Sequence, residues 1–204
     1  MWDVILILLG VAVLLPTAYA GVIGAPYAPT WAKVTQKAFD AIQLGKEDTL
    51  IDLGAGDGRI VIEAARRGAK AIGYELSPIM WAVAKLRVLL QRPHPFRGGL
   101  ASPSQGEAPL LTKEKSATKP GEVSIFFGNF YKQDISHATV IFTFLMPKIM
   151  PRLKTWLAEQ PLPGGKYLLT YAFPLPATEP QHVVSVPNEG KIYIYDLQKL
   201  TKQL

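Results

Sequence analysis

The residues best placed to do chemistry form one short run, Asp52-Leu-Gly-Ala-Gly-Asp-Gly58, and a further acidic residue, Glu75, follows 21 positions after Gly54. Closely spaced glycines permit a tight turn and let backbone N–H groups approach a ligand. An acidic side chain about 20 residues further on accepts hydrogen bonds from ribose hydroxyls. The pattern therefore predicts a nucleotide-binding site. A glycine-rich turn without a ligand is disfavoured, because strand, loop, helix and acid occur in the required order.

The charge of this run indicates which nucleotide binds. The glycine spacing is G-x-G-x-G, not the G-x-G-x-x-G of pyrophosphate-binding loops, and Asp52 and Asp57 flank the glycines. Two carboxylates repel a pyrophosphate and attract a ligand that carries an ammonium or sulfonium group. We therefore predict S-adenosyl-L-methionine as the cofactor. The cofactor contacts predicted around the loop and the second acid are Asp52, Gly54, Ala55, Gly56, Asp57, Gly58, Glu75 and Leu76.

Composition excludes several other classes of protein. The chain has 204 residues, of which 49% are hydrophobic and 19% charged, so a disordered chain is excluded. It contains no cysteine, which excludes a disulfide framework, a thiolate nucleophile and any Cys-ligated metal. Its three histidines lack the spacing of a helical metal site, so no metal is expected.

The elements around the loop predict an α/β fold. Residues 49–53 are expected to form a buried strand, followed by a helix over 59–67, a strand over 69–75 and a helix that begins at Ser77-Pro78. This alternation is typical of a parallel sheet. The later elements expected are strands over 123–127, 139–144 and 166–172, a helix over 147–157, and a hairpin of strands over 182–186 and 191–196. Thr30 is expected to be the N-cap of a helix that precedes the first strand.

Two segments stand apart from this alternation. Residues 91–122 are rich in proline and glycine and are interpreted as a flexible insertion. Residues 4–32 carry no charged side chain, which predicts a transmembrane anchor over residues 1–24 and a single domain over 25–204. A cleaved signal peptide ending at Ala18-Tyr-Ala20 is less favoured, because its amino-terminal region should be basic. Lysines follow the apolar run, so the domain is expected on the cytoplasmic (or matrix) side of the membrane.

The glycine loop and second acid resemble the cofactor motifs of class I S-adenosylmethionine-dependent methyltransferases. Nearly the whole chain is similar to one family among them, the small membrane-anchored lysine methyltransferases related to those acting on the mitochondrial ATP synthase c-subunit. The segments that carry this resemblance are Ala25-Pro-Tyr-Ala-Pro-Thr30, Asp52-Leu-Gly-Ala-Gly-Asp-Gly-Arg-Ile60, Gly73-Tyr-Glu-Leu-Ser-Pro78, Gly128-Asn-Phe-Tyr-Lys132 and Phe144-Leu-Met-Pro147.

The resemblance implies a seven-stranded, Rossmann-like sheet that ends in an antiparallel hairpin. It places Asn129 and Phe130 beside the adenine of the cofactor, with Asn129 standing where the family has an aspartate. The residues suggested for the substrate channel are Tyr27, Pro29, Thr30, Met146, Pro147, Phe173 and Pro174. An alternative is that these side chains only fasten the linker to the domain. No catalytic residue is assigned.

The function predicted is methylation of a lysine in a protein, with a loop of another membrane protein as the expected target. Tethering to the same bilayer raises the effective concentration of such a target. Three alternatives stay open: a nucleic-acid or small-molecule methyltransferase, a non-catalytic cofactor-binding adaptor, and, least favoured, an NAD-binding oxidoreductase. Nucleic acid is not the expected partner, because acidic residues dilute the cluster of basic residues between positions 91 and 122.

Overall fold

The computed structural model describes residues 2–23, 30–90 and 121–202. The strands are β1 (Thr49–Leu53), β2 (Lys70–Glu75), β3 (Val123–Phe127), β4 (Val140–Thr143), β5 (Tyr167–Tyr171), β6 (His182–Val186) and β7 (Gly190–Asp196). The helices are α1 (Trp2–Ile23), α2 (Ala32–Ala41), α3 (Arg59–Arg66), α4 (Pro78–Leu90), α5 (Met150–Ala158) and α6 (Leu197–Lys202), with short 3-10 helices at η1 (Phe130–Lys132) and η2 (Pro147–Ile149). The sequence predicts all seven strands but neither α6 nor η1.

The strands form one mixed sheet in the order β3-β2-β1-β4-β5-β7-β6. β1 to β5 are parallel, whereas β7 runs antiparallel to both β5 and β6. The central strands are apolar runs because both faces of the sheet are covered. The predicted parallel sheet with a closing antiparallel hairpin is confirmed.

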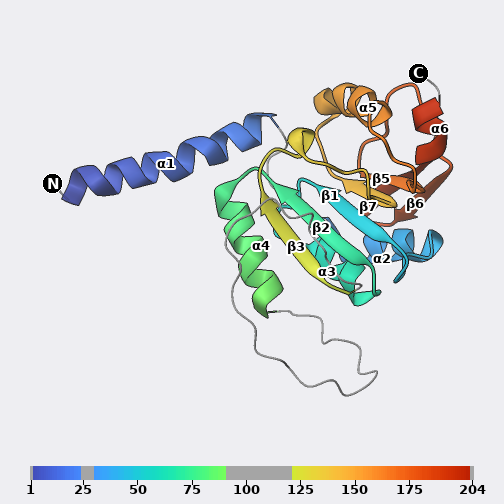
Figure 1. Cartoon of the computed structure of the whole chain (residues 1–204), viewed down its shortest axis with the longest axis horizontal. Helices are drawn as coiled ribbons and strands as arrows, with labels where there is room; N and C mark the ends of the chain where they lie inside the picture. The colour runs from blue at the N-terminus through green and yellow to red at the C-terminus, as the bar shows by residue number, and fades with distance from the viewer. Residues whose placement is uncertain (1, 24–29, 91–120, 203–204) are drawn as a thin grey trace, which may run out of the picture.

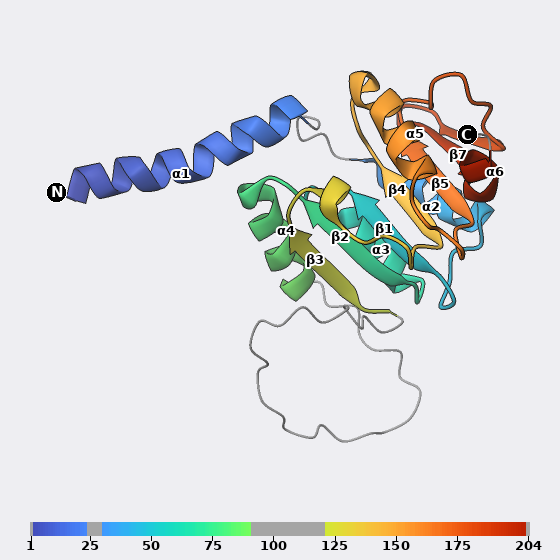
Figure 2. The same cartoon turned by 45° about the horizontal axis from the view of Figure 1, so that its top comes forward.

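Helices cover the two faces and give the sheet two apolar cores. On one face, buried residues of α2 and α3, with Ala84 of α4, pack against the sheet, and Phe39 meets Phe142 of β4 edge to face. On the other face, α5 and α6 contribute buried residues such as Leu153 and Leu197. Leu153 of α5 shares this second core with residues of β4, β5 and β7, and α4 contacts the edge strand β3 (Figure 2). The carboxyl ends of β1 to β5 meet at one edge, where the predicted cofactor residues lie.

The beginning of α2 differs from the sequence prediction. Its N-cap is Trp31, not Thr30, and Trp31 makes no side-chain cap hydrogen bond. The Val34 N–H donates instead to the Glu189 carboxylate of the β6–β7 turn, at 3.0 Å, and the Tyr171 hydroxyl donates to the Glu189 carbonyl at 2.8 Å. The Glu189 carboxylate, from a turn far away in the sequence, therefore accepts one of the N–H groups that lack a partner within the helix at this end.

The N-terminal helix α1 extends away from the sheet and contacts α4 (Figure 1). Within residues 2–23, 30–90 and 121–202, no helix is both long and apolar enough to cross a membrane. The structure thus has an N-terminal helix where the sequence predicts a transmembrane span, and the span itself is not confirmed. Tyr27 and Pro29, and residues 91–120 of the predicted insertion, lie outside the described residues.

Candidate cofactor and substrate site

The glycine loop lies between β1 and α3. Gly54, Gly56 and Gly58 have φ values of 97°, 53° and 79°, a left-handed conformation that strains any residue with a Cβ. The N–H groups of Gly54 and Ala55 donate to the Tyr74 carbonyl at 3.0 and 2.9 Å. The Gly56 N–H donates to Glu75 Oε2 at 2.8 Å. The first half of the loop, from Gly54 to Gly56, is therefore hydrogen-bonded to the end of β2.

Close packing against β2 also positions this loop. Gly73 lies in the middle of β2, and a Cβ added there would stand 2.6 Å from the Ala55 Cβ and 3.1 Å from Ile125 Cδ1. Carbon atoms pack at about 3.5–4.0 Å, so only glycine fits at this position. The sequence motif includes Gly73 but does not by itself reveal this role. A glycine inside an otherwise apolar strand is the signal that could have indicated it.

Two buried carboxylates, Asp52 and Glu75, lie at the carboxyl edge beside the loop. Burial raises the pKa of Asp52 well above its ordinary value, and the nearby charges of Glu75 and Asp57 add to the rise. Burial also raises the pKa of Glu75, although backbone N–H groups of Ser77, Gly56 and Leu76 oppose the shift. Placing acids in such an environment is costly, and it is typical of a site that receives a cationic or hydrogen-bonding ligand.

The geometry of Glu75 fits the role predicted for it. Oε1 accepts the Ser77 N–H at 2.7 Å and Oε2 accepts the Gly56 N–H. The N–H groups of Ser77, Gly56 and Leu76 take at most three of the four lone pairs of this carboxylate, so it can still accept a ribose hydroxyl. Asp52, 2% exposed, can face the ammonium group of the cofactor. The two carboxylates, one that accepts hydrogen bonds and one that can face a cation, therefore suit S-adenosylmethionine.

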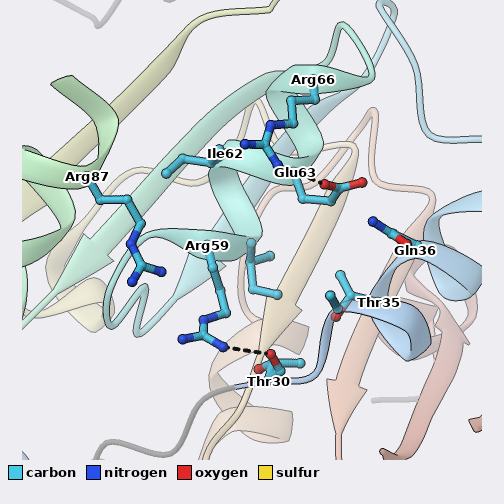
Figure 3. A pocket seen from close by; sticks show the side chains of 10 residues that line it. Thr30, Thr35, Gln36, Arg59, Ile62, Glu63, Arg66 and Arg87 are labelled. Atoms are coloured by element: carbon cyan, nitrogen blue, oxygen red, sulfur yellow. Dashed lines mark hydrogen bonds and ion pairs between the residues drawn. The ribbon is translucent and has the colours of Figure 1, made fainter. Parts of the chain in front are cut away.

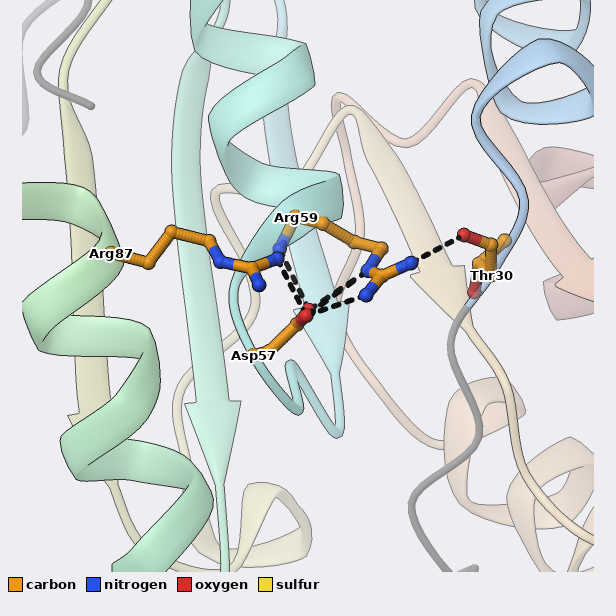
Figure 4. A network of polar contacts seen from close by, with 4 residues as sticks. All are labelled: Thr30, Asp57, Arg59 and Arg87. Carbon is orange, nitrogen blue, oxygen red and sulfur yellow. Dashed lines mark hydrogen bonds and ion pairs between the residues drawn. The ribbon is translucent and has the colours of Figure 1, made fainter. Parts of the chain in front are cut away.

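Asp57 makes ion pairs that the sequence does not predict. Its side chain is 3% exposed and forms ion pairs with Arg59, at 2.7 Å, and with Arg87 of α4 (Figure 4). Arg59 also donates to the Thr30 carbonyl at 3.1 Å. Two guanidinium groups lie against the Asp57 carboxylate and compensate part of its charge. This carboxylate ties the loop to α4 and to the segment before α2, through arginines whose part in the site the sequence pattern does not indicate.

A pocket of about 350 Å³ lies next to these ion pairs, between α2, α3 and Arg87 (Figure 3). Its lining includes Arg59 and Arg66 but neither Asp52 nor Glu75. This pocket is therefore separate from the predicted cofactor site.

Asn129 and Phe130, the residues predicted to contact the adenine, follow a glycine that is hydrogen-bonded to Glu75. The Gly128 N–H donates to the Glu75 carbonyl at 2.9 Å, which brings the start of η1 beside the second acid. Asn129 Oδ1 accepts the Tyr131 N–H at 3.0 Å and so caps η1. Its second lone pair can still accept the adenine amino group. The Phe130 ring is half-buried, with its centroid 5.7 Å from that of Trp156.

Four of the predicted substrate residues, Met146, Pro147, Phe173 and Pro174, lie in the loops after β4 and β5, whereas Thr30 lies before α2, with its carbonyl against Arg59. Leu145 Cδ2 approaches within 3.9 Å of where a Gly54 Cβ would stand, so the loop after β4, which contains Met146 and Pro147, adjoins the cofactor loop. Phe173 and Pro174 follow β5. The Phe173 ring lies 6.4 Å, centroid to centroid, from Phe144, a residue that the sequence places only within a motif.

A strained turn presents Phe173. Ala172 has a φ of 66°, which is costly for a residue with a Cβ. The Phe173 N–H donates to the Tyr171 carbonyl, and the buried hydroxyl of Thr170 donates to the Phe173 carbonyl, both at 2.8 Å. Strain of this kind is frequently found at functional sites, where the surrounding structure holds it in place.

The sheet order, the antiparallel β7, the glycine loop after β1 and the acid after β2 together define a class I methyltransferase. Solved structures share this fold. The chain is similar to an RNA methyltransferase from Salinibacter ruber in complex with S-adenosyl-L-homocysteine, with a TM-score of 0.65 and 24% identity over 83% of this chain and 94% of that one. A methyltransferase from Thiobacillus denitrificans, bound to the same product, matches with a TM-score of 0.51 and 20% identity over 76% and 54% of the two chains.

Sequence relatives narrow the class. A protein-lysine N-methyltransferase from Saccharolobus islandicus is 30% identical over 175 residues, which cover 83% of this chain and 92% of that protein. The ATP synthase c-subunit lysine N-methyltransferase of Rattus norvegicus is 25% identical, over 87% and 69% of the two chains. The adenine nucleotide translocase lysine N-methyltransferase of Mus musculus is 28% identical, over 84% and 63%. No protein-family model matches the sequence.

The chain belongs to the family of protein-lysine N-methyltransferases. It is an enzyme, and its cofactor is S-adenosylmethionine. The resemblance stated from the sequence motifs is confirmed.

Proposed function

We propose that this enzyme transfers the methyl group of S-adenosylmethionine to the ε-amino group of a lysine in a membrane protein. The observation that carries the proposal is the position of Asp52 and Glu75, buried at the carboxyl edge beside loops that offer apolar and aromatic side chains. The acids suit the cofactor, and the apolar loops suit a lysine side chain that must lose its charge before it reacts.

The chemistry is an in-line displacement at a methyl carbon. A lysine amine has a pKa of about 10.4 and is mostly protonated at neutral pH, so it must release a proton to water before it becomes a nucleophile. The bond from the amine nitrogen to the methyl carbon forms as the carbon–sulfur bond breaks, and S-adenosylhomocysteine leaves. Surrounding the amine with Phe144, Phe173 and Met146 disfavours its charged form. The same walls align it with the breaking bond.

The proposed substrate is a membrane protein. The relatives from rat and mouse are named for lysine methylation of the ATP synthase c-subunit and of the adenine nucleotide translocase. The described side chains of α1 from Val4 to Leu8 are apolar and exposed, which suits contact with lipid. We therefore place the enzyme at a membrane through α1, with its domain on the cytoplasmic or matrix side, because Lys33, Lys37 and Lys46 follow this segment.

Calorimetric titration with S-adenosylmethionine and, separately, with NAD tests the cofactor. We expect binding of S-adenosylmethionine alone, and we expect Glu75→Ala and Gly56→Arg to abolish it while the circular dichroism spectrum is kept. Affinity retained in both variants would refute the site.

Transfer of a radioactive methyl group from the cofactor tests the substrate. Solubilised membrane proteins, soluble proteins and RNA are offered in parallel, and the labelled residue is identified by mass spectrometry. Methyl-lysine in the membrane fraction supports the proposal. Label only in RNA or in soluble proteins contradicts it.

A further inference from the structure

One side of α4 carries an exposed apolar stripe. Ile79, Val83, Leu86 and Leu90 recur at the helical spacing i, i+4, i+7, i+11 and therefore lie on one face. Their exposures are 39%, 40%, 57% and 75%. Only Ala84 of α4 is buried against the sheet. α4 packs Ala84 and the partly buried Trp81 and Val88 against the sheet, and it leaves the four residues of the stripe and Leu89 exposed. Exposed apolar patches of this kind mark interaction sites.

The stripe continues onto the elements that α4 contacts. Phe127 of the edge strand β3 is 53% exposed, and its ring centroid lies 6.1 Å from that of Trp81 of α4, so it lies on the same face of the sheet as α4. Phe126, 38% exposed, points to the other face of this edge, beside Tyr74. α4 contacts both β3 and α1. The described part of the chain holds 18 exposed large apolar side chains, and 16 of them belong to α1, α4 or β3. In Figure 1 these three elements lie at the same end of the molecule, away from α6 and the β6–β7 hairpin. We call this combined surface the apolar end.

The distribution around α1 indicates what covers the apolar end. Five consecutive residues, from Val4 to Leu8, are all exposed, so apolar side chains point in every direction around the helix axis. A protein groove covers one face of a helix, whereas lipid surrounds it. The stripe on α4 adjoins this helix and offers the same apolar chemistry, so one lipid surface can cover both.

We infer that α4 and the edge of β3 form a second lipid contact beside α1, which docks the domain on the membrane surface in one orientation. This inference rests on the membrane attachment of α1 proposed above. It has a consequence for the reaction. α4 begins at Pro78, three residues after Glu75, at the carboxyl edge of the sheet. Docking through α4 thus brings the cofactor edge close to the bilayer, where a lysine just outside the membrane can reach it.

The absence of cysteine makes the orientation measurable. Leu86→Cys introduces a single thiol for an environment-sensitive fluorophore, and Leu90→Cys is a second position on the stripe. Val183→Cys is the matched control, because Val183 is 48% exposed on β6, at the opposite edge of the sheet. Each labelled full-length chain is reconstituted with phosphatidylcholine vesicles that carry a quencher in their acyl chains. Flotation reports attachment, and quenching reports contact with the hydrocarbon.

We expect the fluorophores at positions 86 and 90 to shift to the blue and to be quenched several times more strongly than the fluorophore at 183. Weak, equal quenching at all three positions of a chain that floats overturns the inference and leaves the attachment through α1 intact. A chain that does not float overturns both. A blue shift of the fluorophore at position 86 that grows with protein concentration and is not accompanied by quenching would show that a second copy of the chain covers the stripe. This result also overturns the inference. None of these outcomes depends on methyl transfer, so a failure of the lysine reaction is seen separately.

Discussion

Gly73→Ala is expected to displace the cofactor loop, because the new methyl group has no room. The added Cβ would stand 2.6 Å from the Ala55 Cβ, and the normal contact is about 3.5–4.0 Å, so the two must separate by about 1 Å. β2 is hydrogen-bonded to a strand on each side, whereas the loop is held by only a few bonds, so the loop moves. The bonds at risk are those from Gly54 and Ala55 to the Tyr74 carbonyl and from Gly56 to Glu75.

The size of the effect follows from this geometry. Overpacking a filled interior costs about 1–3 kcal/mol. If about 2 kcal/mol of this strain is expressed at the site, affinity for S-adenosylmethionine falls about 30-fold. Calorimetric titration measures the affinity, and urea denaturation measures the free energy of unfolding. Gly164→Ala is the matched control, because its added Cβ meets only Thr139 Cγ2, at 3.9 Å. Both quantities should stay unchanged in this control.

A compensating change provides the sharpest check. Ala55→Gly in the Gly73→Ala background removes the methyl group on the other side of the contact. Most of the lost affinity should return, less the cost of about 0.5–1 kcal/mol for a more flexible loop. The reasoning is wrong if Gly73→Ala binds the cofactor as tightly as the wild type, or if Ala55→Gly restores none of the loss.

Three further results are expected. Asp57→Asn should lower the free energy of unfolding by about 2 kcal/mol in urea denaturation, because the buried carboxylate loses its charge between two partly exposed arginines; an unchanged midpoint would show that these ion pairs contribute nothing. Burial raises the pKa of Asp52 and of Glu75, so the cofactor-free protein binds more protons when folded than when unfolded. Its melting temperature should therefore fall as pH rises from about 4 through the raised values, whereas affinity for the cationic cofactor should rise over the same range. Asp52→Asn should flatten both curves, and curves that keep their slope would locate the titration elsewhere. Ala172→Gly should stabilise the protein by about 0.5–1 kcal/mol, since glycine adopts a φ of 66° without strain; a lower melting temperature would mean that the turn is not strained.

The sequence determined the fold and the place of the cofactor loop in it, because both depend on local patterns. Alternating apolar strands and helices specify a parallel sheet, and a parallel sheet brings the carboxyl ends of its strands to one edge. The glycine loop and Glu75 therefore had to meet there, and the structure shows the Gly56 N–H bonded to the Glu75 carboxylate. The sequence also predicts that a helix begins at Ser77-Pro78. In the structure the Ser77 hydroxyl accepts the Met80 N–H at the start of α4.

Contacts between residues far apart in the chain were decided only by the tertiary structure. The sequence places Asp57 in the glycine loop, but only folding brings Arg87, 30 residues later, into an ion pair with it. The sequence favours Thr30 as the cap of α2, yet Glu189, 155 residues from Val34, occupies that helix end. The residues near a charged side chain or a helix end in the sequence allow several partners for it. Only the packing of the helices and the hairpin on the sheet selects the partner that it contacts.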